Sequence, residues 1–189
     1  MRRDLFVSYE IAINKAWEEL VNLNPEKRSE VKFFADSYTV DLNVRKVISL
    51  ACNVPAKDFT TILILHYLAK KIGGLPEVGG LWLPFRELSG IEGYYEAFKK
   101  RSIEPIIRKY GSNPDGVLEV LKRLPARQTK RGDVGLIIDV FEGVPALVAL
   151  WRADEEFGAD ANIFFDKSIT EIFCTEDIVV LAGMVAANL

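Results

Sequence analysis

The chain has 189 residues, of which 49% are hydrophobic and 27% charged, the balance of an ordinary globular protein. A chain of this length can bury a core without disulfides or metals, and we expect one domain over residues 1–189. Its only cysteines, Cys52 and Cys174, exclude a Cys-only zinc or iron–sulfur site and fit a cytoplasmic setting. No signal peptide is visible, and the apolar tail 178–189 is shorter than the roughly 20 residues that span a bilayer, so we expect no membrane partner.

The net charge of −3 is unevenly distributed along the chain. Residues 99–131 carry ten basic and three acidic side chains, whereas residues 133–189 carry eleven acidic and two basic ones. The two segments can pair with each other in the fold, or the basic one can form a surface for phosphate or nucleic acid. Because the basic segment contains no recognised DNA- or RNA-binding module, we rank nucleic-acid binding last.

The first third of the chain predicts a helix, a small sheet and a second helix. Apolar residues at helical spacing between Tyr9 and Val21 indicate an amphipathic helix that ends at Asn24-Pro25. Aromatic and β-branched runs then predict a small antiparallel meander of three short strands, at 31–34, 38–40 and 46–50. The next helix, 59–71, has apolar residues around its circumference and should be central and buried, with Asp58 as its N-cap.

After a connection rich in glycine and proline at 73–80, the chain predicts further helices and then strands. The expected helices are 94–101, 102–110 and 114–124, with Asn113 capping the last of them, and 176–187, capped by Thr175. The expected strands are 134–141 and 145–151, joined as a hairpin, and 163–165. Because helices and strands do not alternate regularly, we expect an α+β fold, with small antiparallel sheets packed with a central buried helix and flanking helices.

The segment 151–157 contains the strongest candidates for a site, because charges follow directly on a run that should be buried. We select Trp151, Arg152, Asp154 and Glu155 here, together with Asp166 after the next strand. The carboxylates suit a hard cation such as Mg²⁺ or Ca²⁺, although a role as loop acids that accept backbone N–H bonds is the more ordinary alternative. Arg152 so close to buried apolar surface requires a partner, for which we expect Asp154 or Asp166.

Three further candidates lie earlier in the chain. His66 is the only histidine, and on an apolar helix it is either a hydrogen-bonded core or cleft residue or a general acid. Arg86 lies in sequence among aromatic residues that could floor a pocket, where it would clamp an anion. Among these aromatic residues we select Tyr95 as functional and expect Tyr94 and Phe98 to belong to the core.

Five blocks of the sequence resemble a known family. The blocks are 62–68, 81–88, 94–98, 151–157 and 164–166, and the tryptophan-to-DEEF block is the most specific. They resemble uncharacterised proteins of anaerobic archaea and bacteria that share a domain of unknown function. Some of those relatives carry an iron–sulfur module like that of the corrinoid protein of the acetyl-CoA pathway, which implies a role near one-carbon or corrinoid metabolism. This chain lacks such a cysteine cluster, and it has Ala153 and Gly158 where relatives tend to have Gly and Pro.

From these observations we expect a ligand-binding or accessory protein that takes an anionic small molecule or a protein partner. A metal-assisted hydrolase or transferase that uses Asp154, Glu155 and Asp166 is the alternative, and it requires these carboxylates to converge. Nucleic-acid binding through 99–131 is the second alternative. The sequence specifies no cofactor, no metal ligand set and no catalytic residue.

Overall fold

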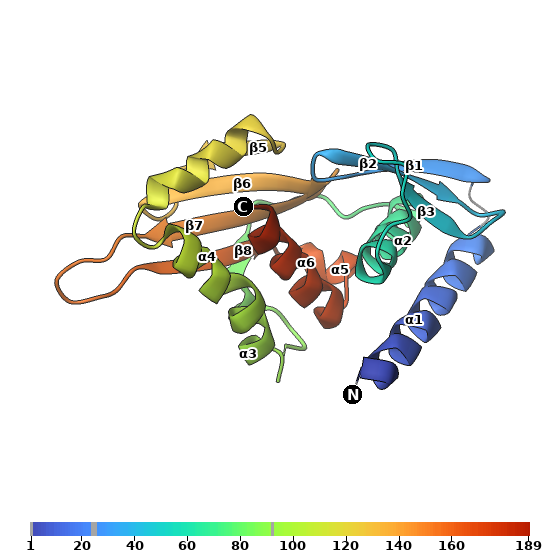
Figure 1. Cartoon of the computed structure of the whole chain (residues 1–189), viewed down its shortest axis with the longest axis horizontal. Helices are drawn as coiled ribbons and strands as arrows, with labels where there is room; N and C mark the ends of the chain where they lie inside the picture. The colour runs from blue at the N-terminus through green and yellow to red at the C-terminus, as the bar shows by residue number, and fades with distance from the viewer. Residues whose placement is uncertain (1, 24–25, 92) are drawn as a thin grey trace. The chain divides into compact units, whose positions relative to one another are not determined.

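The computed structural model describes residues 2–23, 26–91 and 93–189, and the side chains from Tyr9 onward (Figure 1). The chain forms two compact units, Met1–Pro76 and Glu77–Leu189. Both units combine helices with an antiparallel sheet, which confirms the predicted α+β class. In the described residues, no helix is both long and apolar enough to cross a membrane.

The first unit consists of two helices and a three-stranded sheet. Its elements are α1 (Arg2–Asn22), β1 (Arg28–Phe33), β2 (Asp36–Asp41), β3 (Lys46–Ser49) and α2 (Asp58–Gly73). The strands pair in the order β1-β2-β3, which confirms the predicted meander. The helix α2 buries nine residues and packs against α1 and β1. The expected stop at Asn24-Pro25 lies outside the described residues.

The second unit is built on a five-stranded antiparallel sheet. Its strands are β4 (Trp82–Pro84), β5 (Ala126–Thr129), β6 (Val134–Phe141), β7 (Val144–Trp151) and β8 (Asp160–Asp166), in the order β4-β8-β7-β6-β5. The hairpin β6–β7 turns at Gly143, whose φ of 74° is readily adopted by glycine. The strand β7 occupies the centre of the sheet, and its residues 144–150 are buried, as the sequence predicts.

Helical segments complete the second unit. They are η1 (Phe85–Glu87), α3 (Tyr95–Phe98), η2 (Lys99–Ile103), α4 (Glu104–Tyr110), η3 (Pro114–Lys122), α5 (Ile169–Ile172) and α6 (Thr175–Asn188). Both η2 and α4 contact β8, η3 contacts β6, and α6 packs along η2. The two faces of the sheet differ, because side chains alternate along each strand. Fully buried Leu136, Val148 and Phe165 lie on one face, whereas Leu147, Ala149 and Phe164 lie on the other and pack with Trp82, Ile137 and Trp151.

Several local expectations need correction. The predicted helices 94–101 and 102–110 form one run, in which η2 is a π-helical turn. Pro105 lacks the N–H that would bond to the preceding turn, and Ser102 donates its hydroxyl to the Phe98 carbonyl at 2.6 Å, which together favour this wider turn. The predicted α-helix 114–124 is the 3₁₀ helix η3.

Of the expected N-caps, Asp58 and Thr175 are wrong, whereas Asn113 does occupy the N-cap position of η3, although without a side-chain hydrogen bond. The residues before the first turns are Lys57, Asn113 and Cys174, and none of them caps its helix with a side-chain hydrogen bond. Asp58 lies inside the first turn of α2, where its charge still favours the helix N-terminus. Thr175 lies inside α6 and donates its hydroxyl to the Gly90 carbonyl at 2.9 Å, so it ties two segments together instead of capping one.

Candidate functional site

The candidate site lies where the central strand β7 ends. Trp151 is its last residue and pairs directly with Asp160, the first residue of β8, and Ala149 pairs with Asn162. Residues two apart on a strand share a face, so the side chains of Trp151, Asp160 and Asn162 emerge on the same side of the sheet. The indole is half-buried and packs at the edge of the apolar cluster that Leu147, Ala149 and Phe164 form.

The loop between β7 and β8 is shaped by one carboxylate. Asp154 Oδ1 accepts hydrogen bonds from the backbone N–H groups of Glu156 at 2.9 Å and Phe157 at 2.7 Å, and the Asp154 N–H donates to the Phe157 carbonyl at 2.9 Å. The N–H groups of Phe157 and Glu156 stabilise the charged carboxylate and lower the pKa of Asp154. The expectation that Asp154 accepts backbone N–H bonds is therefore confirmed. This turn fixes Phe157 in place, although its side chain is 69% exposed.

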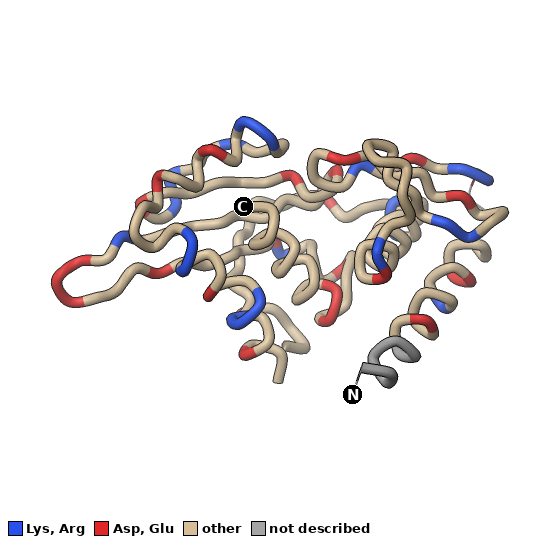
Figure 2. The backbone as a smooth tube through the Cα atoms, in the orientation of Figure 1, with Lys and Arg blue, Asp and Glu red and all other residues tan. Residues whose placement is uncertain are grey.

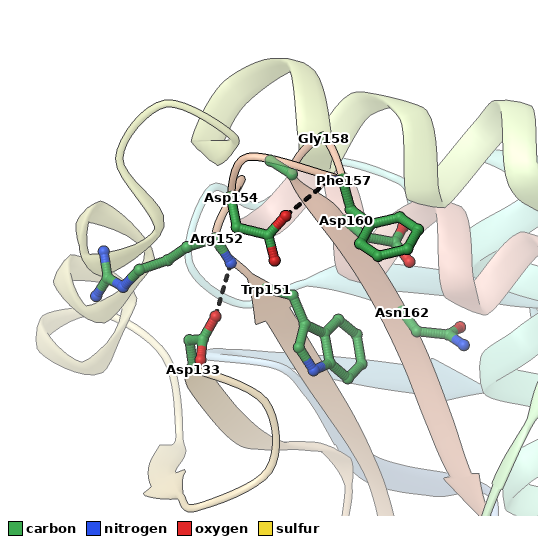
Figure 3. Close-up of a pocket in the computed structure, with 9 residues that line it drawn as sticks. Asp133, Trp151, Arg152, Asp154, Phe157, Gly158, Asp160 and Asn162 are labelled. Atoms are coloured by element: carbon green, nitrogen blue, oxygen red, sulfur yellow. Dashed lines mark hydrogen bonds between the residues drawn. The ribbon is translucent and has the colours of Figure 1, made fainter.

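Arg152 binds acids other than the expected ones. Its Nη2 donates to Asp115 Oδ2 of η3 at 2.6 Å, and its backbone N–H donates to Asp133 Oδ2 at 2.7 Å. The nearby Asp115 carboxylate raises the pKa of the guanidinium. The predicted partners, Asp154 and Asp166, are therefore wrong, because the chain turns at 152 so that the side chain extends toward η3. Figure 3 shows the guanidinium pointing away from Trp151.

These residues line an open hollow of about 830 Å³. Its walls come from the start of β6, the end of β7, the following loop and the start of β8, and they consist of Asp133, Trp151, Arg152, Asp154, Phe157, Gly158, Ala159, Asp160 and Asn162. In Figure 3 the indole of Trp151 lies below the loop, with the carboxylate of Asp154 above it. The hollow combines two aromatic rings with three carboxylates. The guanidinium of its one basic residue, Arg152, contacts Asp115, which lies outside the walls.

The structure separates Asp166 from this hollow. Asp154 precedes β8 and Asp166 ends it, and a seven-residue strand is roughly 20 Å long. Asp166 is 3% exposed and accepts N–H bonds from Gly80 at 2.7 Å, Gly79 at 3.4 Å and Ser168 at 3.1 Å. Burial alone would raise its pKa, but the hydrogen bonds from Ser168, Gly80 and Gly79 prevail, and the pKa is lowered. This carboxylate holds the glycine-rich segment against the end of β8.

The predicted carboxylate metal site is thus not assembled. Glu155 lies at the exposed tip of the loop and does not line the hollow, and Asp166 is at the far end of β8. Within the ranges that the structure describes, no group of three or more His, Cys, Asp or Glu side chains is arranged to hold a metal ion. Asp154 and Asp166 remain separate because each accepts the backbone N–H groups of a different turn, at opposite ends of β8.

Arg86 and Tyr95 do come together, as the sequence analysis suggests. The Arg86 guanidinium carbon lies 3.8 Å from the centroid of the Tyr95 ring, a close cation–π contact. Beneath them, the rings of Phe85 and Phe98 stack with centroids 4.3 Å apart. Phe98 is buried, in agreement with its predicted place in the core, whereas Tyr94 is half-buried and donates its hydroxyl to Glu176 of α6. None of these five residues lines the hollow beside Trp151.

His66 belongs to the other unit, where it lies half-buried on α2. The basic segment 99–131 is dispersed over several elements, as the blue positions in Figure 2 show. One of its arginines pairs with the acidic segment, since Arg127 Nη1 lies 3.0 Å from Asp139 Oδ1 on the neighbouring strand. Pairing between the two segments, the first of the two alternatives, thus occurs at this position.

Six residues of the hollow were not selected from the sequence, namely Asp133, Phe157, Gly158, Ala159, Asp160 and Asn162. The pairing of β7 with β8 brings Asp160 and Asn162 beside Trp151, and a correct register for that pair would have identified both. Phe157 was visible as an apolar residue among loop acids. For Asp133 the sequence gives no such signal, because its role depends on the contact between the start of β6 and the end of β7.

Comparison with known proteins identifies a family. Residues 18–188 match the model of a domain of unknown function, DUF3786, and the chain belongs to this family. The resemblance to proteins that share a domain of unknown function is thereby confirmed. No curated protein and no solved structure matches the chain significantly.

Proposed function

We propose that this member of the DUF3786 family is a ligand-binding or accessory protein and that the hollow beside Trp151 is its binding site. The supporting observation is the hollow itself, whose volume of about 830 Å³ lies within the range of roughly 300–1,000 Å³ usual for small-molecule sites. It forms at the end of the central strand, where the sheet positions the side chains and the loop between β7 and β8 supplies one wall.

The composition of the walls also suits ligand binding. Trp151 and Phe157 offer apolar faces, and the carboxylates and Asn162 offer polar contacts. Phe157 is 69% exposed and yet held by the turn at Asp154, so a ligand that covers its ring buries apolar surface at little cost in loop ordering.

An anionic ligand, expected from Arg86 and Arg152, has less support at this hollow. The charge of Arg152 is engaged by Asp115, and Arg86 lies over Tyr95, which is not in the walls. The Arg86–Tyr95 surface remains the place where an anion would bind. The metal-assisted hydrolase and the nucleic-acid alternatives have no assembled site in their favour, and we do not propose them.

A cytoplasmic location and a link with anaerobic one-carbon or corrinoid metabolism stay predictions. The second rests on the family resemblance alone. Native mass spectrometry of the protein, purified under anaerobic conditions, would test the metabolic link together with ligand binding. A bound molecule adds its mass to that of the 189-residue chain, and this added mass indicates which molecule is bound.

The proposed site is tested by a substitution that leaves the fold intact. We expect F157A to lose a co-purified or screened ligand while its melting temperature in the unliganded state stays unchanged, since Phe157 is largely exposed. L81A is the matched control, because Leu81 is a 53% exposed apolar residue outside the hollow. Equal binding by F157A, L81A and the wild type would refute the assignment of the site.

A further inference from the structure

We infer that the hollow beside Trp151 takes an organic cation, specifically the ammonium group of a small molecule. This inference rests on the proposed function and names the class of ligand. It follows from two features of the walls: a negative charge that the neighbouring arginine neutralises only in part, and aromatic rings beside that charge.

The first feature is the charge. Asp133, Asp154 and Asp160 line the hollow, and Arg152 is the only basic residue among its lining residues. Its guanidinium is 2.6 Å from Asp115, outside the walls, and points away from the hollow. Its charge interacts chiefly with Asp115 and less with Asp133, which leaves Asp154 and Asp160 as the carboxylates that it does not balance. Backbone N–H groups lower the pKa of Asp154, which keeps this wall charged in mildly acidic solution. The acidic loop tip at 154–156 adds to the negative potential at the entrance (Figure 2).

The second feature is the aromatic surface. Trp151 and Asp160 are directly paired across β7 and β8, which places their Cβ atoms about 5 Å apart. A cation within about 6 Å of an indole centroid is attracted by the ring, and tryptophan is the strongest partner in such contacts. An ammonium group over this indole therefore lies within reach of the Asp160 carboxylate as well.

The combination selects an organic ammonium over a bare metal ion. An aromatic ring supplies no oxygen ligand, whereas Mg²⁺ and Ca²⁺ require six or more oxygen ligands from protein and water. An alkylated ammonium instead gains from contact with Trp151 and from burial against the exposed ring of Phe157. The volume of about 830 Å³ leaves room for the rest of a small molecule.

The test compares choline with its uncharged isostere, in which a carbon atom replaces the quaternary nitrogen. Each is titrated into the full chain at constant ionic strength, and the indole N–H signals of Trp17, Trp82 and Trp151 are followed by NMR, with the Trp151 signal assigned from W151F. We expect choline to shift the Trp151 signal in a saturable manner and the isostere to bind at least tenfold more weakly. The Trp17 signal should not move, because Trp17 is a buried residue of α1.

Two pairs of variants sharpen the assignment. D160N should weaken choline binding about fivefold, whereas E155Q, which removes the same charge from the loop tip outside the walls, should weaken it less than twofold. W151L should abolish most of the binding and W151F should retain part of it, as a cation–π contact requires. Because both variants lack the Trp151 signal, their choline affinity is measured by isothermal titration calorimetry. If W151L does not fold, D160N and E155Q decide the question.

The outcomes separate this inference from the proposed function. Equal affinity for choline and its isostere would overturn the cation while leaving a binding site in place. A Trp151 signal that moves only with an anion such as benzoate would overturn it in favour of the anionic ligand predicted from the sequence. If choline produces no saturable shift, the inference fails, and the F157A comparison then decides whether the hollow binds anything.

Discussion

Arg152 and Asp115 are joined across 37 residues of sequence by a contact of 2.6 Å between the guanidinium Nη2 and the carboxylate Oδ2. The pair connects the end of the central strand β7 to the helix η3. Its side chains are 50% and 55% exposed, so water screens the interaction on both sides. This arrangement decides what removal of the arginine should do.

Replacement of Arg152 by alanine should change stability only slightly. An exposed ion pair contributes little, so we expect the melting temperature to fall by no more than about 3 °C, and by less in 1 M salt. Scanning calorimetry at low and high salt checks this, with D115A as the matched partner variant. A fall of about 10 °C in either variant would show that the pair is a main structural link.

Asp166 should contribute far more to stability, because its buried carboxylate accepts three backbone N–H groups. In D166N the side chain keeps one oxygen acceptor, but an NH₂ group replaces the other carboxylate oxygen. This NH₂ group then faces a backbone N–H donor, with which it cannot form a hydrogen bond. We expect the free energy of unfolding to fall by about 1–3 kcal/mol, measured by urea denaturation. D139N is the control, since the Asp139 side chain is 50% exposed, and it should be nearly neutral. Equal stability of D166N and the wild type would contradict the role of Asp166 in holding the glycine-rich segment against the end of β8.

The contribution of Asp166 should depend on pH in a defined direction. The pKa of Asp166 is lowered in the folded chain, whereas an unfolded aspartate titrates near pH 3.9. The stabilisation is therefore complete above about pH 5 and is lost as the pH falls through the folded pKa. The difference in unfolding free energy between the wild type and D166N should be constant from about pH 6 to 7 and shrink below about pH 4. A difference that grows in acid would reverse the assigned sign.

The sequence predicts the parts of this fold that depend on local patterns. Continuous apolar runs identified β6 and β7, and the short connection at Gly143 identified their hairpin. In the sequence, Arg86 and Tyr95 lie in one segment rich in aromatic residues, and the two side chains are in contact. Such a contact is easier to anticipate because the two residues are close along the chain.

The wrong predictions concern contacts between residues that are far apart in the sequence. The partner of Arg152 lies on η3, and the hydrogen bonds of Asp166 reach back to Gly79 and Gly80, contacts that no periodicity in the sequence encodes. The predicted convergence of Asp154 and Asp166 failed because β8 separates them along its whole length. The hollow itself depends on the register of β7 against β8. The strand predicted from the sequence, 163–165, is too short to determine that register.

Cys174 should react slowly with alkylating agents. Cys174 is an exposed residue, but partial burial of its thiol, aided by the neighbouring carboxylates of Asp177 and Glu176, raises its pKa to about 11. At pH 8 roughly one thiol in a thousand is then ionised, against about one in four for an ordinary cysteine with a pKa near 8.5. Because a thiolate of higher pKa is also the stronger nucleophile, iodoacetamide should modify Cys174 in C52S about tenfold more slowly than it modifies glutathione, as followed by mass spectrometry. In urea the difference should disappear, and a fast reaction of the folded protein would contradict the raised pKa.

The turn before β6 should tolerate no side chain at Gly132. This residue has a φ of +72°, and an added Cβ would lie 2.8 Å from the Leu150 carbonyl oxygen. The same oxygen accepts the Asp133 N–H at 2.9 Å, so the turn that carries one wall of the hollow would have to shift. We expect G132A to lower the free energy of unfolding by about 1–3 kcal/mol. It should also weaken choline binding.

G158A provides the matched control for this substitution. Gly158 lines the hollow itself, but an added Cβ there meets nothing within 4 Å. We therefore expect the unfolding free energy of G158A in urea to lie within about 0.5 kcal/mol of the wild type. If G132A were as stable as G158A, the close approach of Gly132 to β7 would not constrain the turn. That result would contradict the proposal that this turn fixes Asp133 beside Trp151.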